Sequence, residues 1–165
     1  MSGAERFLTL LTRVERGVCI AAFTVMALAV FADVAARAVL GHGLMGALQI
    51  GVIGMIAAAF FGAGLASAQG GHLRPRVFDR LIPPALGPLA DRVAEALTAL
   101  FCAAFALVAL GVTVETARLG DVNPVLGWAV WPAQAVLPLA FASLAARHAL
   151  YAIRPGLRPG ERAAG

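Results

Sequence analysis

Long apolar runs without any charge alternate with short polar segments along this chain. The uncharged runs cover residues 17–32, 43–71, 96–114 and 122–146. Each approaches or exceeds the roughly 20 apolar residues that a helix needs to cross the hydrocarbon core of a bilayer. A helix is favoured there because it satisfies its own backbone hydrogen bonds. The pattern therefore predicts an all-α membrane protein, a single unit over 1–165, with four transmembrane helices at about 17–40, 43–69, 90–116 and 123–147.

The polar segment between the second and third runs has a helical pattern of its own. Apolar side chains recur at positions 73, 77 and 81, with 78 and 82 beside them, whereas arginines and Asp79 take the other face. Pro83 and Pro84 end this pattern. A short amphipathic helix over about 73–82 would lie in the membrane interface, with its apolar stripe buried and its arginines against anionic membrane lipid.

The composition excludes a soluble enzyme domain. Only 13% of the residues are charged and 61% are hydrophobic, whereas about a quarter of the residues of a soluble domain are charged. All 13 basic residues are arginine, which gives a net charge of +4. Because these arginines stand in short groups beside the apolar runs, they indicate membrane topology, and we expect no nucleic-acid partner.

The arginines also predict the orientation of the four spans. The N-terminal tail, the middle segment and the C-terminal tail share one side of the membrane. That side carries 11 arginines, which are Arg6, Arg13, Arg16, Arg74, Arg76, Arg80, Arg92, Arg147, Arg154, Arg158 and Arg162. The other side carries Arg37 and Arg118. The positive-inside rule then places both termini and the middle segment of a multi-pass membrane protein in the cytoplasm.

A cleaved signal peptide is the other reading of the first apolar run. Arginines precede the run, and Ala36-Arg37-Ala38 resembles a cleavage site. However, the run has 16 uncharged residues before Asp33, which is longer than the usual core of a signal peptide. We therefore expect the segment to be retained as the first span.

Asp33 and Arg37 are the first candidates for a functional contact. They are four residues apart, so they face the same side of a helix and can pair. The helical rise places both near the outer headgroup boundary. The pair is either a contact for a partner on the outer face or an interfacial ion pair that satisfies itself.

A row of small residues in the second span is the second candidate. Gly54, Ala58, Gly62 and Ala66 repeat every four residues. Such rows let helices approach closely in lipid, either within this chain or against another protein. Trp131 lies near the outer end of the fourth span, where it sits at the interface or packs against a partner.

No cofactor is expected from the histidines or the cysteines. His42, His72 and His148 all lie at span ends, whereas a haem between helices needs histidines that face one another within the bundle. Cys19 and Cys102 lie in apolar runs without a partner at metal or redox spacing, so we interpret them as small buried hydrophobes. No nucleophile–base pair or metal-binding pattern is visible, and the sequence predicts no enzyme activity.

Several motifs occur in the order and at the spacing typical of one family. They are Asp33-Val34-Ala35-Ala36-Arg37, Gly70-Gly71-His72-Leu73-Arg74, Asp79-Arg80-Leu81-Ile82-Pro83, Asn123-Pro124-Val125-Leu126-Gly127 with Trp131, and Leu137-Pro138-Leu139-Ala140-Phe141. Over about residues 13–150 the chain resembles the DctQ-type small permease of tripartite ATP-independent periplasmic (TRAP) transporters. It departs from the family pattern at Gly46, Gln49 and Arg76, where an aromatic residue, a glutamate and an aspartate are common.

The resemblance implies a role in a three-part uptake system for organic anions such as carboxylates. In that system a periplasmic solute-binding protein captures the solute, and a large elevator-type permease carries it inward, coupled to a sodium gradient. The small subunit would pack beside the large permease as a scaffold without a substrate site. The alternative is a membrane anchor for a respiratory or redox complex.

Overall fold

The structure is a computed structural model that describes residues 2–70 and 87–159. Its helices are α1 (Gly3–Leu40), α2 (Ala47–Ala68), α3 (Gly87–Leu119), α4 (Trp131–Gln134) and α5 (Val136–Ile153), followed by the 3₁₀ turn η3 (Pro155–Leu157). Four segments are long and apolar enough to cross a membrane: α1, α2, α3, and α4 together with α5. The prediction of an all-helical protein with four spans is confirmed. The interfacial helix predicted over about 73–82 lies outside the described residues.

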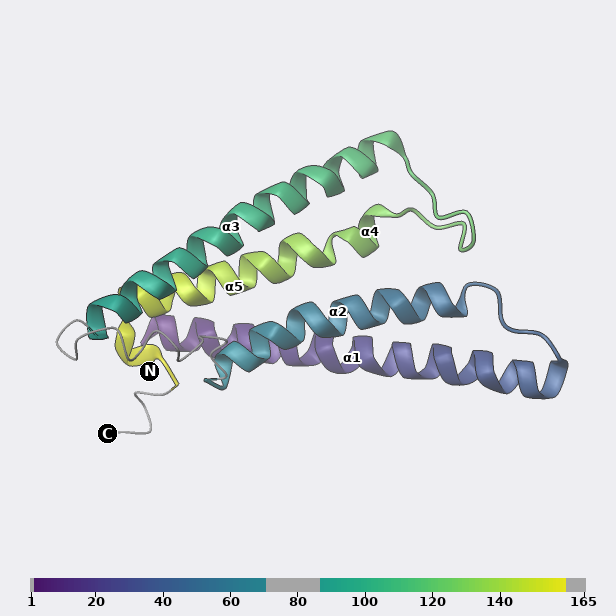
Figure 1. Cartoon of the computed structure of the whole chain (residues 1–165), viewed down its shortest axis with the longest axis horizontal. Helices are drawn as coiled ribbons and strands as arrows, with labels where there is room; N and C mark the ends of the chain where they lie inside the picture. The colour runs from purple at the N-terminus through teal and green to yellow at the C-terminus, as the bar shows by residue number, and fades with distance from the viewer. Residues whose placement is uncertain (1, 71–86, 160–165) are drawn as a thin grey trace.

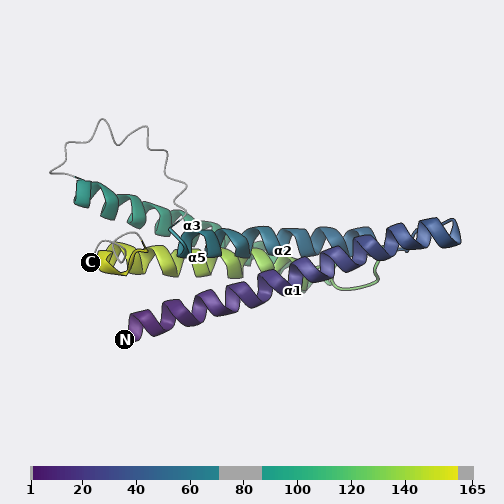
Figure 2. The same cartoon turned by 90° about the horizontal axis from the view of Figure 1, so that it is seen from below.

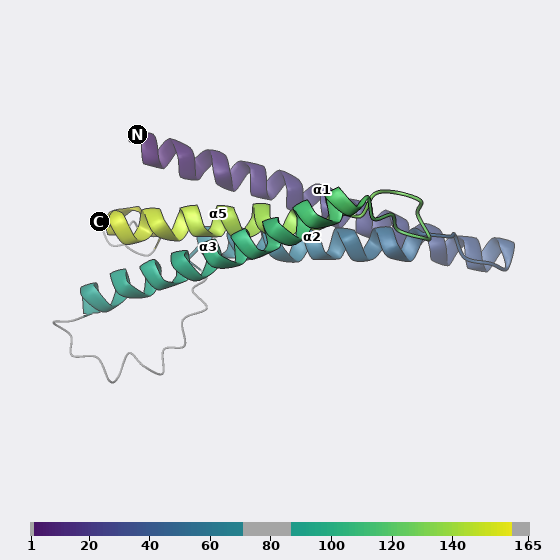
Figure 3. The same ribbon diagram turned by 90° about the horizontal axis from the view of Figure 1, so that it is seen from above.

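The four spans form two helix pairs (Figure 1). Helix α1 packs along α2, α3 packs along α5, and the pairs meet mainly between α2 and α5. The views in Figures 2 and 3 show that the start of α1, the start of α3 and the end of α5 lie at the same end of the molecule. We call this the terminal end, and the opposite end, with the loops at 41–46 and 120–130, the loop end.

Helices α1 and α3 are longer than a bilayer requires. Helix α1 has 38 residues, about 57 Å at 1.5 Å per residue, whereas the hydrocarbon core is about 30 Å thick. The first span was predicted to start near residue 17, but α1 begins at Gly3. Ser2 and Glu5 fix this start as a capping box, in which each side chain accepts a hydrogen bond from the other residue's backbone N–H. The apolar run therefore marks only the part of α1 that fits within the lipid.

The fourth span begins later than the sequence predicted. We expected a helix from about residue 123 to 147, but the chain becomes helical at Trp131 and continues to Ile153. The residues before Trp131 form a tight loop, closed by an antiparallel bridge between Val122 and Ala129. Their apolar character had extended the predicted span, although Pro124 and Gly127 favour a turn.

Asn123 organises this loop. Its side-chain oxygen accepts hydrogen bonds from the backbone N–H groups of Val125 and Leu126, at 2.9 and 3.0 Å. Its own N–H donates to the carbonyl of Trp128 at 2.8 Å. Gly127 adopts a φ of 67°, which glycine tolerates better than other residues. The Asn-Pro-Val-Leu-Gly motif is therefore a turn at the loop end and not part of a helix.

The backbones of α1 and α2 approach closely at Gly54. A Cβ atom on Gly54 would lie 2.8 Å from the carbonyl oxygen of Ala22 and 3.0 Å from the Cβ atom of Met26. At Gly62 the nearest atom would be the Cys19 sulfur at 3.8 Å, an ordinary contact. Ala66 is exposed. The buried positions of α2 recur every three to four residues, at Ala47, Gly51, Gly54, Ala57, Phe61, Gly64 and Ser67. The small residues recur strictly every four, so their row starts in the contact with α1 and then turns away from it.

Aromatic contacts join the two helix pairs near the middle of the unit. The ring of Phe141 on α5 lies 5.5 Å from that of Phe60 on α2 and 5.4 Å from that of Phe105 on α3. Such edge and tilted pairs stabilise a contact beyond the area that they bury. Phe141 therefore links α2 and α3 through α5.

Replacing Gly54 tests the close contact between α1 and α2. Gly54→Ala should destabilise the subunit by about 1–3 kcal/mol, because the new methyl group forces the two backbones apart. Gly62→Ala is the matched control and should be neutral or slightly stabilising, since the space is open and alanine favours helix. Thermal unfolding in detergent, followed by tryptophan fluorescence, measures both. Equal effects of the two variants would contradict the assignment of Gly54 as the contact point.

Candidate functional site

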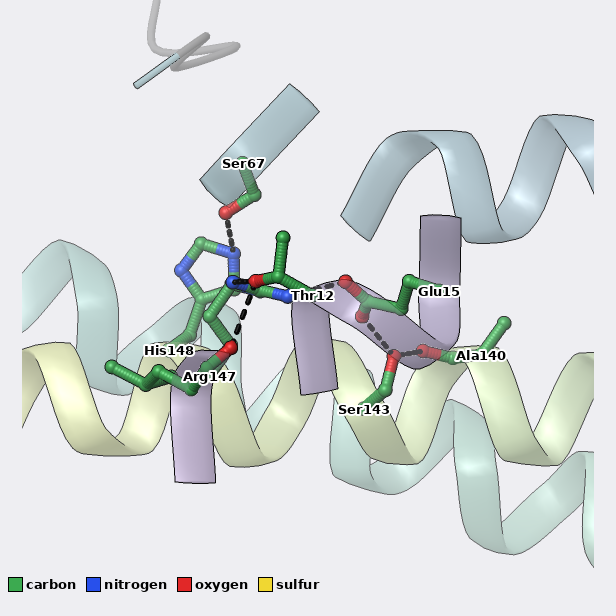
Figure 4. A network of polar contacts seen from close by, with 8 residues as sticks. Thr12, Glu15, Ser67, Ala140, Ser143, Arg147 and His148 are labelled. Atoms are coloured by element: carbon green, nitrogen blue, oxygen red, sulfur yellow. Dashed lines mark hydrogen bonds and ion pairs between the residues drawn. The ribbon is translucent and has the colours of Figure 1, made fainter. Parts of the chain in front are cut away.

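A buried ion pair joins the first and last spans at the terminal end (Figure 4). Glu15 of α1 and Arg147 of α5 bind each other, and both side chains are 1% exposed. Ser143, one turn before Arg147, donates its hydroxyl to Glu15 Oε1 at 2.8 Å. Arg147 Nη1 donates to the hydroxyl of Thr12 at 3.2 Å. Charged side chains that are buried to this extent require such partners, because an unpaired charge is costly away from water.

Helix α2 makes room for the carboxylate of this pair. A Cβ atom on Gly64 would lie 2.6 Å from Glu15 Oε1, so any side chain at this position would require the Glu15 carboxylate to shift. The buried ion pair is therefore enclosed by three helices, α1, α2 and α5. This placement explains why Gly64 is buried although it lies outside the small-residue row that the sequence pointed to.

A second polar cluster continues from the next residue of α5. His148 places Nδ1 2.5 Å from Glu95 Oε2 of α3 and Nε2 3.2 Å from the Ser67 hydroxyl of α2. Arg158, just after η3, lies 3.4 Å from Glu95 and 3.3 Å from Asp91 of α3. We call the two clusters together the terminal ion network; its charged and titratable members are Glu15, Asp91, Glu95, Arg147, His148 and Arg158.

Helix α5 holds both sides of the network because its adjacent residues point in different directions. Successive positions on a helix are about 100° apart. Arg147 therefore reaches α1 while His148 reaches α3 and α2. Breaking one partner of a buried pair is costly because it leaves an uncompensated charge. The network thus fixes how the two helix pairs sit against each other.

This network is hardly visible in the sequence. In the sequence, Arg147 is one of the arginines that mark the cytoplasmic side, and Glu95 borders an apolar run. Their partners lie more than 50 positions away in the chain, so local spacing could not reveal them. The one available signal was the spacing of Ser143 and Arg147, which places two polar groups on the same stripe of an apolar helix.

At the loop end, the predicted pair of Asp33 and Arg37 forms. The guanidinium of Arg37 lies 2.9 Å from Asp33 Oδ2. Asp33 has a second role, because its Oδ1 accepts a hydrogen bond from the backbone N–H of Leu44 at 2.8 Å. The side chain of Asp33 is 15% exposed and that of Arg37 is 64% exposed. Asp33 therefore anchors the loop between α1 and α2, while Arg37 presents its charge to the surroundings.

The two loops at this end touch each other. A Cβ atom on Gly46, whose φ is 84°, would lie 2.5 Å from Cδ2 of Leu126. Trp128 lines an apolar groove of about 400 Å³ whose other walls are residues of α1 and α2, among them Val25 and Ile53. Trp131, the first residue of α4, is 45% exposed. The loop between α3 and α4 therefore folds over the α1–α2 pair and leaves Trp131 accessible.

The histidines and cysteines have protein contacts of their own. Both ring nitrogens of His148 face protein groups, and His72 lies outside the described residues. The Cys19 thiol donates to the carbonyl of Ala58 at 3.5 Å, and Cys102 is buried. Within residues 2–70 and 87–159, no three His, Cys, Asp or Glu side chains are placed to hold a metal ion.

Four apolar spans, a polar network that binds helix to helix, and a charged loop end define a small helical membrane protein. A comparison with protein families identifies the family to which it belongs. The family of the DctQ component of tripartite ATP-independent periplasmic transporters matches residues 26–158. The chain belongs to this family and is the small subunit of a TRAP transporter. No curated protein sequence matches the chain.

Removing the charge of Glu15 tests the terminal ion network. Glu15→Gln should destabilise the subunit by about 3–5 kcal/mol, because Arg147 is left buried without a counter-charge. For a chain of this size, that corresponds to a fall of the order of 10 °C in the unfolding temperature. Thermal unfolding of the purified subunit in detergent measures the change.

Two further variants make this test specific. Glu115→Gln is the matched control, because Glu115 is exposed on α3 and the chemical change is the same. It should leave the unfolding temperature nearly unchanged. The double variant Glu15→Leu/Arg147→Met removes both charges and should recover much of the lost stability. A Glu15→Gln effect no larger than that of Glu115→Gln would contradict the role assigned to the pair.

Proposed function

We propose that this chain is a static, non-catalytic scaffold of a sodium-coupled TRAP uptake system for organic anions such as carboxylates. The observation that carries the proposal is that the buried charges at the terminal end bind one another across helices. Groups that bind a solute or a coupling ion need free donors or acceptors in a cavity. Here Glu15, His148 and the two terminal nitrogens of Arg147 are engaged in holding α1, α2, α3 and α5 together.

The apolar surfaces of the outer helices support a role beside a larger membrane protein. None of the most apolar part of α1 is buried within the chain, and only 17% of that of α3 is. Phe23, Leu28 and Phe31 of α1 are each more than half exposed. In a membrane such a face is covered by lipid or by another helix. We propose that part of it packs against the large permease, and that Ala66 on α2, the exposed residue of the small-residue row, is a further candidate contact.

The proposed orientation follows from the arginines. The terminal end, with the start of α1 and the end of α5, faces the cytoplasm, and the loop end with Arg37 faces the periplasm of a bacterial inner membrane. Arg37 and Trp131 then lie on the side where a soluble binding protein delivers its solute. We propose that Arg37 contributes to the transient docking of that protein, since exposed charges steer encounter more than they add to affinity.

Uptake by reconstituted vesicles tests the function and the role of Arg37 together. With the large permease, the solute-binding protein and an inward sodium gradient, carboxylate uptake should require this chain. Arg37→Glu should lower uptake several-fold at low binding-protein concentration, and excess binding protein should restore part of it, because docking is weakened while assembly is kept.

Arg118→Glu is the matched control for this experiment. Arg118 is an exposed arginine in the last turn of α3, at the same end of the molecule. It should leave the dependence of uptake on binding-protein concentration unchanged. Uptake at the full rate without this chain would contradict the scaffold function. A loss that excess binding protein cannot restore, or a complex that no longer purifies intact, would instead assign Arg37 to assembly.

A further inference from the structure

An open cleft of about 470 Å³ lies at the terminal end between α1, the end of α2, α5 and η3. Its volume is in the range of small-molecule binding sites. The polar side is formed mainly by α1, with Thr9, Arg13 and Arg16, which lie on one side of that helix at a spacing of three and four. The apolar side is formed by Leu8, Ala68, Tyr151, Leu157 and Pro159.

The positive charge in this cleft is not matched by carboxylates. Within the described residues, neither Arg13 nor Arg16 forms an ion pair. The one carboxylate that lines the cleft belongs to Glu5, which accepts a hydrogen bond from the backbone N–H of Ser2 at 2.7 Å. The cleft therefore carries an excess of guanidinium groups, and guanidinium is the side chain best suited to bind phosphate oxygens.

A buried donor beneath the cleft is a second, independent sign of an anionic ligand. Arg147 also lines the cleft, and its side chain is 1% exposed. Two of its nitrogens bind Glu15 and Thr12, but its Nε–H has no acceptor in the described part of the chain. A buried N–H without an acceptor is uncommon in native structures and calls for an explanation. Because Arg147 is among the residues that line the cleft, an anion bound there would bring negative charge close to this guanidinium.

The position of the cleft relative to the membrane selects the ligand. Helix α2 has 22 residues, about 33 Å, so it just crosses the hydrocarbon core. Ala68 and Gln69 at its end therefore lie at the level of the lipid headgroups. A ligand in the cleft contacts arginines at the headgroup level and an apolar wall beside them. These two surfaces are complementary to the charged headgroup and the adjoining hydrocarbon of an anionic phospholipid.

We propose that the cleft binds the phosphodiester headgroup of one anionic phospholipid. Arg13 and Arg16 would bind the phosphate oxygens from α1, and the glycerol and upper acyl chain would lie along the wall at Leu8 and Tyr151. The lipid would bridge the start of α1 and the end of α5, next to the terminal ion network. This inference concerns the helical unit itself and does not depend on the proposed transport function.

Lipid titration of the full-length subunit tests the proposal. The detergent-purified chain is titrated with phosphatidylglycerol or phosphatidylcholine of the same acyl chains, and bound lipid is counted by native mass spectrometry. One phosphatidylglycerol should bind more tightly than phosphatidylcholine, and Arg13→Gln/Arg16→Gln should weaken it about tenfold or more. Thr9→Phe, which narrows the cleft without changing charge, should also weaken it, whereas Arg13→Lys/Arg16→Lys should retain most of the preference.

The control variant is Arg6→Gln/Arg154→Gln, which removes two exposed arginines at the same end that do not line the cleft. It should change phosphatidylglycerol binding by less than twofold. An equal loss in both double variants would overturn the proposal in favour of a diffuse surface charge. Displacement of the lipid by inorganic phosphate at comparable concentration would overturn it in favour of a soluble anion. Equal binding of the two lipids would overturn it as well.

Discussion

The ion pair between Glu15 and Arg147 is the interaction on which the arrangement of this subunit depends. Helices α1 and α5 otherwise make little contact, and the aromatic contacts around Phe141 link α5 only to α2 and α3. Apolar faces in lipid gain little from the hydrophobic effect, because lipid is as apolar as the helices. A buried charge pair is different, since separating the partners leaves a charge inside the protein without its counter-charge. This asymmetry favours one relative position of the two helix pairs.

The rest of the terminal end follows from that position. Gly64 lets α2 pass beside the carboxylate, and His148 extends the contact to Glu95 and Ser67. Two other contacts stabilise the loop end. The carboxylate of Asp33 accepts a hydrogen bond from the backbone N–H of Leu44, and the side chain of Leu126 packs against Gly46. A unit fixed at both ends suits a subunit whose family works within a larger transporter, and it leaves the outer faces of α1 and α3 for lipid and partners.

The sequence predicted the parts of the fold that depend on local pattern. Four apolar runs gave four spans, and the spacing of Asp33 and Arg37 gave their ion pair. The family motifs were also sufficient to identify the family. The predicted start of the fourth span was wrong because an apolar segment need not be helical. At Asn123 the side chain closes a turn instead. The terminal ion network could not be predicted because its pairs join distant positions, and each member looks locally like an interfacial charge.

The central claim, that the terminal ion network keeps the two helix pairs fixed, is tested most directly by a distance measurement in the working transporter. Spin labels at Gly17→Cys on α1 and Leu97→Cys on α3, with Cys19 and Cys102 replaced by alanine, report the separation of the pairs at the terminal end. Both label sites are exposed. Pulsed electron paramagnetic resonance is recorded on the reconstituted complex with and without sodium, solute and binding protein. A single distance distribution that is the same in all conditions is the predicted result, and a shift or a second population that depends on sodium or solute would contradict the account.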